Sequence, residues 1–175
     1  MAIRKILLLG NPTLRVKSEK VRNFSDRKVK QTIEDLRDTL QEFRRTHGFG
    51  RGIAAPQIGV TRRVVFIDVT SPMPMFNPDI IKRSAQKMTM LDDCFSFPDL
   101  LVKVNRHAKI TVRYHDENGS RQQLDADGGL SELLQHEIDH LNGVLAIDRA
   151  IDSKHIILRS VWEKMKLTAK ERVAL

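Results

Sequence analysis

The sequence has a single cysteine, Cys94, among its 175 residues. One thiol cannot form a disulfide within the chain, which excludes a disulfide-stabilised fold and fits a reducing compartment. Long apolar runs are also lacking, because none approaches the ~20 residues of a membrane-spanning helix. The apolar stretch near the N-terminus is too short for a secretory leader, and no small-residue cleavage site follows it. We therefore expect a soluble cytoplasmic protein with no membrane partner.

Aromatic residues make up only 5% of the chain, and they form no RNA-binding signature. The sequence also has no run of lysines and arginines and no zinc-knuckle spacing, so we expect no specific DNA contact. The net charge of +8 could favour RNA, the ribosome or anionic membranes, but a solubilising surface is the plainer interpretation. Weak ribosome contact through the basic C-terminal segment remains an open expectation.

The length and the apolar content of 41% predict one globular domain over residues 1–175, without linkers or repeats. A first helix is predicted from Asp26 to Thr46, since apolar residues recur there at helical spacing. Ser25 or Asp26 is the expected N-cap and Gly48 lies just past the end. The apolar stripe, which we assign to core packing, comprises Val29, Ile33, Leu36, Leu40 and Phe43.

Short strands are predicted in the middle of the chain, because its segments there are rich in β-branched residues. Asn118-Gly119 is a strong hairpin signal between two of them. A second helix is predicted where apolar residues recur from Leu130 to Leu141, and it should end near Asn142-Gly143. A last helix should run from Ser153 to about Leu167. The predicted strands are 63–69, 76–83, 100–104, 109–116 and 121–127, and the last helix should dock on the core through Ile156, Ile157, Val161 and Met165.

The segment QHEIDH, residues 135–140, carries the clearest chemical signal. In a helix, His136 and His140 lie one turn apart on one face, as two ligands of one metal ion require. Glu137 falls between these histidines and the apolar stripe, where a carboxylate is costly without a partner. Beside a metal-bound water it would have one, and it could shuttle the water's proton. The pattern therefore favours a metal site over a charged amphipathic helix that matches by chance.

A catalytic metal ion usually has three protein ligands and one open position. Carboxylates downstream of the histidines are available, as in a zincin-type metalloprotease, and Cys94 could instead supply a thiolate. The alternative for Cys94 is a small buried thiol with no ligand role. Spacing alone leaves this choice open; the carboxylate candidates are Asp148, Asp152 and Glu163.

Three motifs follow one another along the chain: GRGIAAPQ (50–57), DDCFS (92–96) and QHEIDH (135–140). Their order and spacing resemble those of the peptide deformylases, and NPTLR (11–15) resembles that family's N-terminal turn. The resemblance extends from about residue 6 to the end of the chain. The resemblance implies an α+β fold, with short, mostly antiparallel strands around a central helix that carries HEIDH. It also implies N-terminal and C-terminal helices.

The same resemblance implies a hydrolase that removes the N-formyl group from the N-terminal methionine of nascent polypeptides and releases formate. It implies one divalent metal ion, natively Fe(II), with Zn, Ni or Co as substitutes. Glu137 would act as general acid and base for attack by metal-bound hydroxide. The residues that the resemblance assigns are Cys94, His136 and His140 to the metal, Gln57 and the backbone N–H of Phe95 to the oxyanion, and Asp92 and Arg106 to a supporting ion pair.

Three residues depart from the family's pattern and could alter the substrate pocket. Arg51 and Glu132 stand where apolar residues are usual, and Asp93 stands where a glycine is usual. One hypothesis is that the protein accepts a polar residue next to the formyl group or works poorly on formyl-methionine. The other is that Arg51 and Glu132 pair with each other or face water and leave the methionine pocket intact. The remaining candidates for substrate contact are Gly50, Gly52 and Leu133, and a deformylase-like protein with lost turnover is a further alternative.

Overall fold

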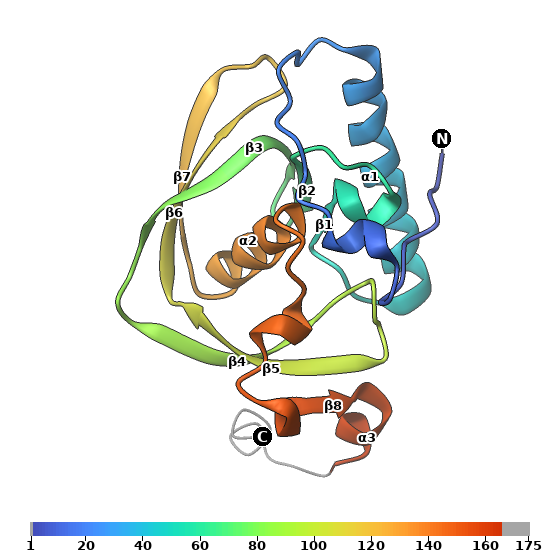
Figure 1. Cartoon of the computed structure of the whole chain (residues 1–175), viewed down its shortest axis with the longest axis vertical. Helices are drawn as coiled ribbons and strands as arrows, with labels where there is room; N and C mark the ends of the chain where they lie inside the picture. The colour runs from blue at the N-terminus through green and yellow to red at the C-terminus, as the bar shows by residue number, and fades with distance from the viewer. Residues whose placement is uncertain (1, 166–175) are drawn as a thin grey trace.

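The computed structural model describes residues 2–165, which form two antiparallel sheets around one helix (Figure 1). The larger sheet has the strand order β1-β2-β3-β6-β7, and the smaller one has the order β4-β5-β8. The helix α2 (Gly128–Leu141) contacts strands of both sheets. The α+β expectation with a central helix is therefore confirmed. The strands are β1 (Gly52–Ala54), β2 (Val64–Asp68), β3 (Pro72–Arg83), β4 (Lys87–Asp93), β5 (Leu100–His107), β6 (Lys109–His115), β7 (Arg121–Asp127) and β8 (Ile156–Leu158).

The helix α1 (Arg27–His47) packs on β1 and β2, with its predicted apolar stripe inward. All five residues of that stripe are buried. Asp26 caps the helix, because its side chain accepts a hydrogen bond of 2.8 Å from the N–H of Lys28. Gly48 follows in the left-handed region with φ of 78°, the conformation that ends many helices. The pattern that predicted this helix also predicted its two ends.

The central helix α2 is buried on every side from Ser131 to Leu141. It ends as the sequence indicates, with Asn142 as C-cap and Gly143 at a φ of 73°. A side chain at Gly143 would collide with the backbone of Arg15, so this position requires glycine for space as well as for conformation. Because the helix is enclosed, each of its polar side chains needs a partner inside the protein.

All five predicted strands are present, and the β6–β7 hairpin turns at Asn118-Gly119. Three strands were missed: β1, β4 and β8. The first and last of these are three residues long, and β4 contains the polar run that leads into Cys94. Three residues are too few for a periodic pattern, and β4 has few β-branched residues and ends in two aspartates, which are uncommon in strands.

The predicted C-terminal helix is wrong in its first part. Residues 156–158 form β8, which pairs with β5, and the helix α3 covers only Arg159–Lys164. Ile156 and Val161 are 39% and 44% exposed, so they do not dock on the core, while Ile157 and Met165 are half-buried. The expected end at Leu167 lies outside the described residues. Within residues 2–165, no helix combines the length and apolar character that crossing a bilayer demands.

Candidate metal centre

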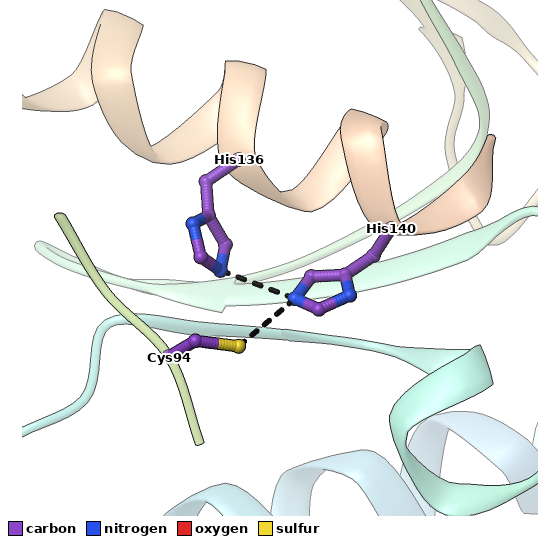
Figure 2. A group of neighbouring side chains, drawn as sticks. All are labelled: Cys94, His136 and His140. Carbon is purple, nitrogen blue, oxygen red and sulfur yellow. Dashed lines mark hydrogen bonds between the residues drawn. The ribbon is translucent and has the colours of Figure 1, made fainter. Parts of the chain in front are cut away.

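The side chains of Cys94, His136 and His140 point toward one another and form one buried cluster, as Figure 2 shows. The two histidines project from successive turns of α2, and Cys94 approaches from the segment after β4. The His140 Nε2 atom lies 3.1 Å from His136 Nε2 and 3.2 Å from the Cys94 sulfur. The side chains are buried, with residue exposures of 1% for Cys94, 6% for His136 and 1% for His140. Two distant segments thus bring three donor atoms to one point.

The spacing of these atoms fits one divalent ion. Around a tetrahedral ion with metal–nitrogen bonds of about 2.1 Å, two donor atoms lie roughly 3.4 Å apart. The observed separations of 3.1 and 3.2 Å are close to that value. A thiolate with two imidazoles is also a donor set that suits zinc or a late first-row transition metal.

The carboxylates that could have served as third ligand lie elsewhere. Asp148 forms an ion pair with Arg15, and Asp152 lies 2.7 Å from the His155 ring. Glu163 lies exposed on α3. Within residues 2–165, His140 belongs to one group of metal-ligating side chains only, and its other members are Cys94 and His136. The geometry therefore favours the sulfur as third ligand over the zincin-type arrangement.

A buried chain of charges orients His136. Its Nδ1 atom lies 2.8 Å from Asp92 Oδ1, which leaves Nε2 directed at the centre. Arg106 binds the other Asp92 oxygen at 2.9 Å and Asp139 at 2.5 Å. Burial would raise the pKa of Asp92, but the charges and hydrogen bonds of His136 and Arg106 outweigh it and lower the pKa to about 2. The contact between Arg106 and Asp92 is the one that the resemblance implies.

The pKa values of the two histidines are shifted in opposite directions. Burial alone would lower the pKa of His136, but the adjacent Asp92 carboxylate outweighs it and holds the pKa well above the usual range. The pKa of His140 is lowered well below its usual range, first by burial and then by the neighbouring His136 charge. His140 is therefore held neutral, the form in which an imidazole nitrogen binds a metal ion.

Glu137 reaches the same cavity from the next position of α2. Its Oε2 atom is buried and has no hydrogen-bond partner in the described part of the chain. Burial raises the pKa of this carboxyl to about 7, with the Glu132 and Asp92 charges adding and the His136 charge opposing. A Cβ at Gly52 would lie 2.9 Å from Glu137 Oε1, so glycine at this position makes room for the carboxylate. A group with this pKa and no partner suits proton transfer near neutral pH.

Gln57 presents its amide N–H₂ to the cysteine. The N–H of Ala54 donates to Gln57 Oε1 at 2.9 Å, which fixes which end of the amide faces inward. The Nε2 atom then lies 3.7 Å from the Cys94 sulfur and 3.5 Å from Ser96 Oγ. The N–H of Phe95 bonds no other backbone group within the described residues, while its ring stacks on Phe43 at 3.8 Å. Two donors beside the centre are thus available to a ligand.

These residues line one cavity of about 400 Å³, and the charges that depart from the family's pattern are part of its wall. Arg51 binds Glu132 Oε2 at 2.5 Å and the carbonyl of Gly129 at 3.0 Å. The expected alternative that Arg51 and Glu132 pair with each other is confirmed, but both residues still line the cavity. Besides that pair, Gln57, Cys94, His136 and Glu137, the wall contains Phe49, Gly50, Gly52, Asp93, Phe95 and Leu133.

Asp93 is held by a residue from the far end of the chain. Arg159 binds the Asp93 carboxylate at 2.8 Å, donates to the carbonyl of Pro98 and stacks over the Phe49 ring at 4.3 Å. Sequence reasoning missed Arg159, Phe49 and Asp139. Arg159 is 66 positions from its partner and has no local signal. Asp139 lies inside QHEIDH, where its charge in a buried helix could have indicated an internal partner.

Comparisons with known proteins show the family to which the chain belongs. A family model described as polypeptide deformylase matches residues 3–155. A peptide deformylase of Agrobacterium fabrum is 40% identical over 154 residues, 85% of this chain and 87% of the relative. One of Thermotoga maritima is 34% identical over 167 residues, 95% of this chain and 98% of the relative. The crystal structure of a peptide deformylase from Synechococcus elongatus in complex with actinonin superposes with a TM-score of 0.79 at 32% identity, covering 94% of this chain and 87% of that one.

Proposed function

We propose that Cys94, His136 and His140 hold the metal ion of this protein, which belongs to the polypeptide deformylase family. Members of this family are hydrolases, and the protein removes the N-formyl group from nascent polypeptides. The observation that carries this proposal is the convergence of a thiol and two imidazoles beside an unpartnered, buried Glu137. When bound, the ion supplies Lewis acidity that lowers the pKa of water toward neutrality.

Glu137 moves the proton. It takes the proton of the attacking water and delivers it to the leaving amine, so one group serves as base and then as acid. Its pKa of about 7 in the metal-free protein reflects burial, which excludes solvent from the carboxyl group. Near neutral pH the protonated and ionised forms are therefore similar in free energy. The glycine at position 52 supports this role, because it leaves the carboxylate room to reach the cavity.

Gln57 and the backbone N–H of Phe95 stabilise the negative charge that develops on the formyl oxygen. The contact between Ala54 and Gln57 Oε1 supports this assignment, since it fixes the donor end of the amide before the substrate arrives. Such preorganised donors contribute roughly 3–4 kcal/mol each when tested by removal in other enzymes. The Phe43–Phe95 stack holds the backbone that carries the second donor.

We assign Fe(II) as the native ion, with Zn, Ni or Co as substitutes. One thiolate and two imidazoles accept each of these ions, but intrinsic affinity rises from Fe(II) through Co(II) to Ni(II), so the iron assignment rests on the family resemblance and not on affinity. Purification without oxygen followed by elemental analysis tests the assignment. Iron at one equivalent per chain supports it, and zinc at one equivalent with no iron contradicts it.

Formate release from formyl-Met-Ala-Ser by the metal-loaded protein tests the activity. The Glu137→Gln variant should bind the ion and release no formate above background. Cleavage of an internal peptide bond without formate release would instead support a zincin-type protease. A metal-loaded protein that does neither would support lost turnover.

We also propose that the protein acts in the cytoplasm and contacts the ribosome weakly through its basic C-terminal segment. The net charge of +8 supports electrostatic contact with RNA. Arg159 does not contribute, because Asp93 and Phe49 hold it at the cavity. Release from ribosomes by high salt would support the contact, and absence from ribosomal pellets at low salt would contradict it.

A further inference from the structure

We propose that the Arg51–Glu132 pair makes this cavity select a neutral amide side chain, such as that of glutamine, in the first residue of the formylated substrate. The inference rests on the proposed function and concerns which formylated peptide the site prefers. It starts from two charged residues in the wall of the cavity that also contains Cys94 and Glu137. Glu132 is only 5% exposed, so its carboxylate belongs to the cavity wall and not to the outer surface.

The pair has hydrogen-bonding capacity to spare on both sides. A guanidinium has five N–H groups, and the contacts of Arg51 with Glu132 and Gly129 use two nitrogens once each. Among residues 2–165, nothing donates a hydrogen bond to Glu132 Oε1. The wall therefore offers a donor and an acceptor close together, with no net charge.

A neutral amide matches both halves of this wall. Its carbonyl can accept from Arg51 and its N–H₂ can donate to Glu132, while the 2.5 Å ion pair stays intact. A cationic side chain would compete with Arg51 for Glu132, and an anionic side chain would compete with Glu132 for Arg51. A hydroxyl is shorter and satisfies one partner well but not both. Glutamine is similar to methionine in length, so it fills the same space.

Methionine meets this wall at a cost. Its thioether is at best a weak acceptor, so it covers the Arg51–Glu132 pair without satisfying the donors and the acceptor that it removes from solvent. Sites built to hydrogen-bond a substrate discriminate strongly against an analogue that lacks the bonding group. The Asp93 carboxylate, which is also part of the wall, does not change this balance, because Arg159 holds it.

The test compares kcat/KM for formyl-Gln-Ala-Ser, formyl-Met-Ala-Ser and formyl-Nle-Ala-Ser with metal-loaded wild-type protein. We expect the glutamine peptide to be preferred by at least about tenfold over the other two. Formyl-Lys and formyl-Glu peptides should rank below glutamine. A preference for methionine over glutamine overturns the inference and leaves the proposed function standing.

If the Arg51–Glu132 pair causes the preference for glutamine, replacing both residues should reverse that preference. In Arg51→Leu with Glu132→Leu, both charges leave together, so no unpaired buried carboxylate remains, and the preference should invert toward methionine. The matched control is Arg62→Leu with Glu19→Leu, which removes an exposed ion pair whose nitrogen and oxygen lie 2.7 Å apart. Neither residue lines the cavity, so this variant should keep the wild-type ratio. An unchanged ratio in a folded double variant at positions 51 and 132 contradicts the inference.

A binding measurement tests the selectivity of the cavity separately from the hydrolytic activity. Calorimetry with the product peptides Gln-Ala-Ser and Met-Ala-Ser should show tighter binding of the first, independently of turnover. If no formyl peptide releases formate, the proposed function fails, and calorimetry still decides the selectivity of the cavity. Equal or weaker binding of the glutamine peptide overturns the inference.

Discussion

Cys94 is the ligand on which the metal centre depends at the scale of a single residue. Replacing it with serine keeps the size of the side chain and removes the thiolate. We expect the Cys94→Ser variant to lose more than tenfold in affinity for the ion, measured by competition with a chelator. The controls are Asp148→Asn and Glu163→Gln, which remove the other ligand candidates and should bind as the wild type does. Full affinity in Cys94→Ser would contradict the assigned ligand set.

Glu137 should make the metal-free protein less stable as the pH rises. Its folded-state pKa of about 7 exceeds the ordinary value of 4.5, so the folded protein holds a proton that the unfolded chain has released. The resulting stabilisation is complete below pH 4.5 and is lost as the pH rises through 7, and it amounts to on the order of 3 kcal/mol. Urea unfolding across this range should show a smaller decline in Glu137→Gln. Equal declines in both proteins would refute the raised pKa.

At the scale of elements, Arg106 on β5 joins β4 to the central helix. It is 3% exposed and neutralises Asp92 on β4 and Asp139 on α2. Arg106→Leu leaves Asp92 with His136 and Asp139 with Arg149 as the remaining charged partners, so we expect a loss of up to about 3–5 kcal/mol in the free energy of unfolding. The affinity for the metal ion should also fall, by roughly 10–100-fold, because Asp92 orients His136.

The exposed strand arginine Arg113, which lies 3.4 Å from Asp79, gives the matched control. Arg113→Leu should change stability by less than about 1 kcal/mol and leave metal affinity unchanged. Urea denaturation and chelator competition check both variants. A loss in Arg106→Leu no larger than that of the control would mean that the buried network does not connect these elements.

How far the sequence predicted this structure differs from element to element. α1 and α2 were predicted with their ends, because their apolar spacing and their caps are local features. β8 was predicted as helix, since its pairing with β5 is a contact between segments more than fifty residues apart. At the site, the histidines and Glu137 followed from helix geometry alone, whereas Cys94 needed the resemblance. Arg159 at the cavity had no signal, because its role exists only through contacts made after folding.

At the scale of the whole molecule, one cooperative domain is still a prediction. The helix α2 contacts strands of both sheets, so breaking either sheet uncovers part of this helix. The only tryptophan, Trp162, lies on α3 at the C-terminal end of the described chain. We expect its fluorescence and the far-ultraviolet circular dichroism to report one coincident urea transition. An earlier fluorescence transition would mean that β8 and α3 unfold as a separate unit.

The solitary thiol also limits how this enzyme can survive oxidants. A sulfenic acid formed at Cys94 finds no second thiol within the 175 residues, so it cannot be trapped as an internal disulfide and reduced from there. Burial keeps the sulfur away from bulky reductants, while small peroxides could still follow the route of the substrate. Further oxidation to the sulfinic form is then irreversible, and lost molecules must be replaced by new synthesis.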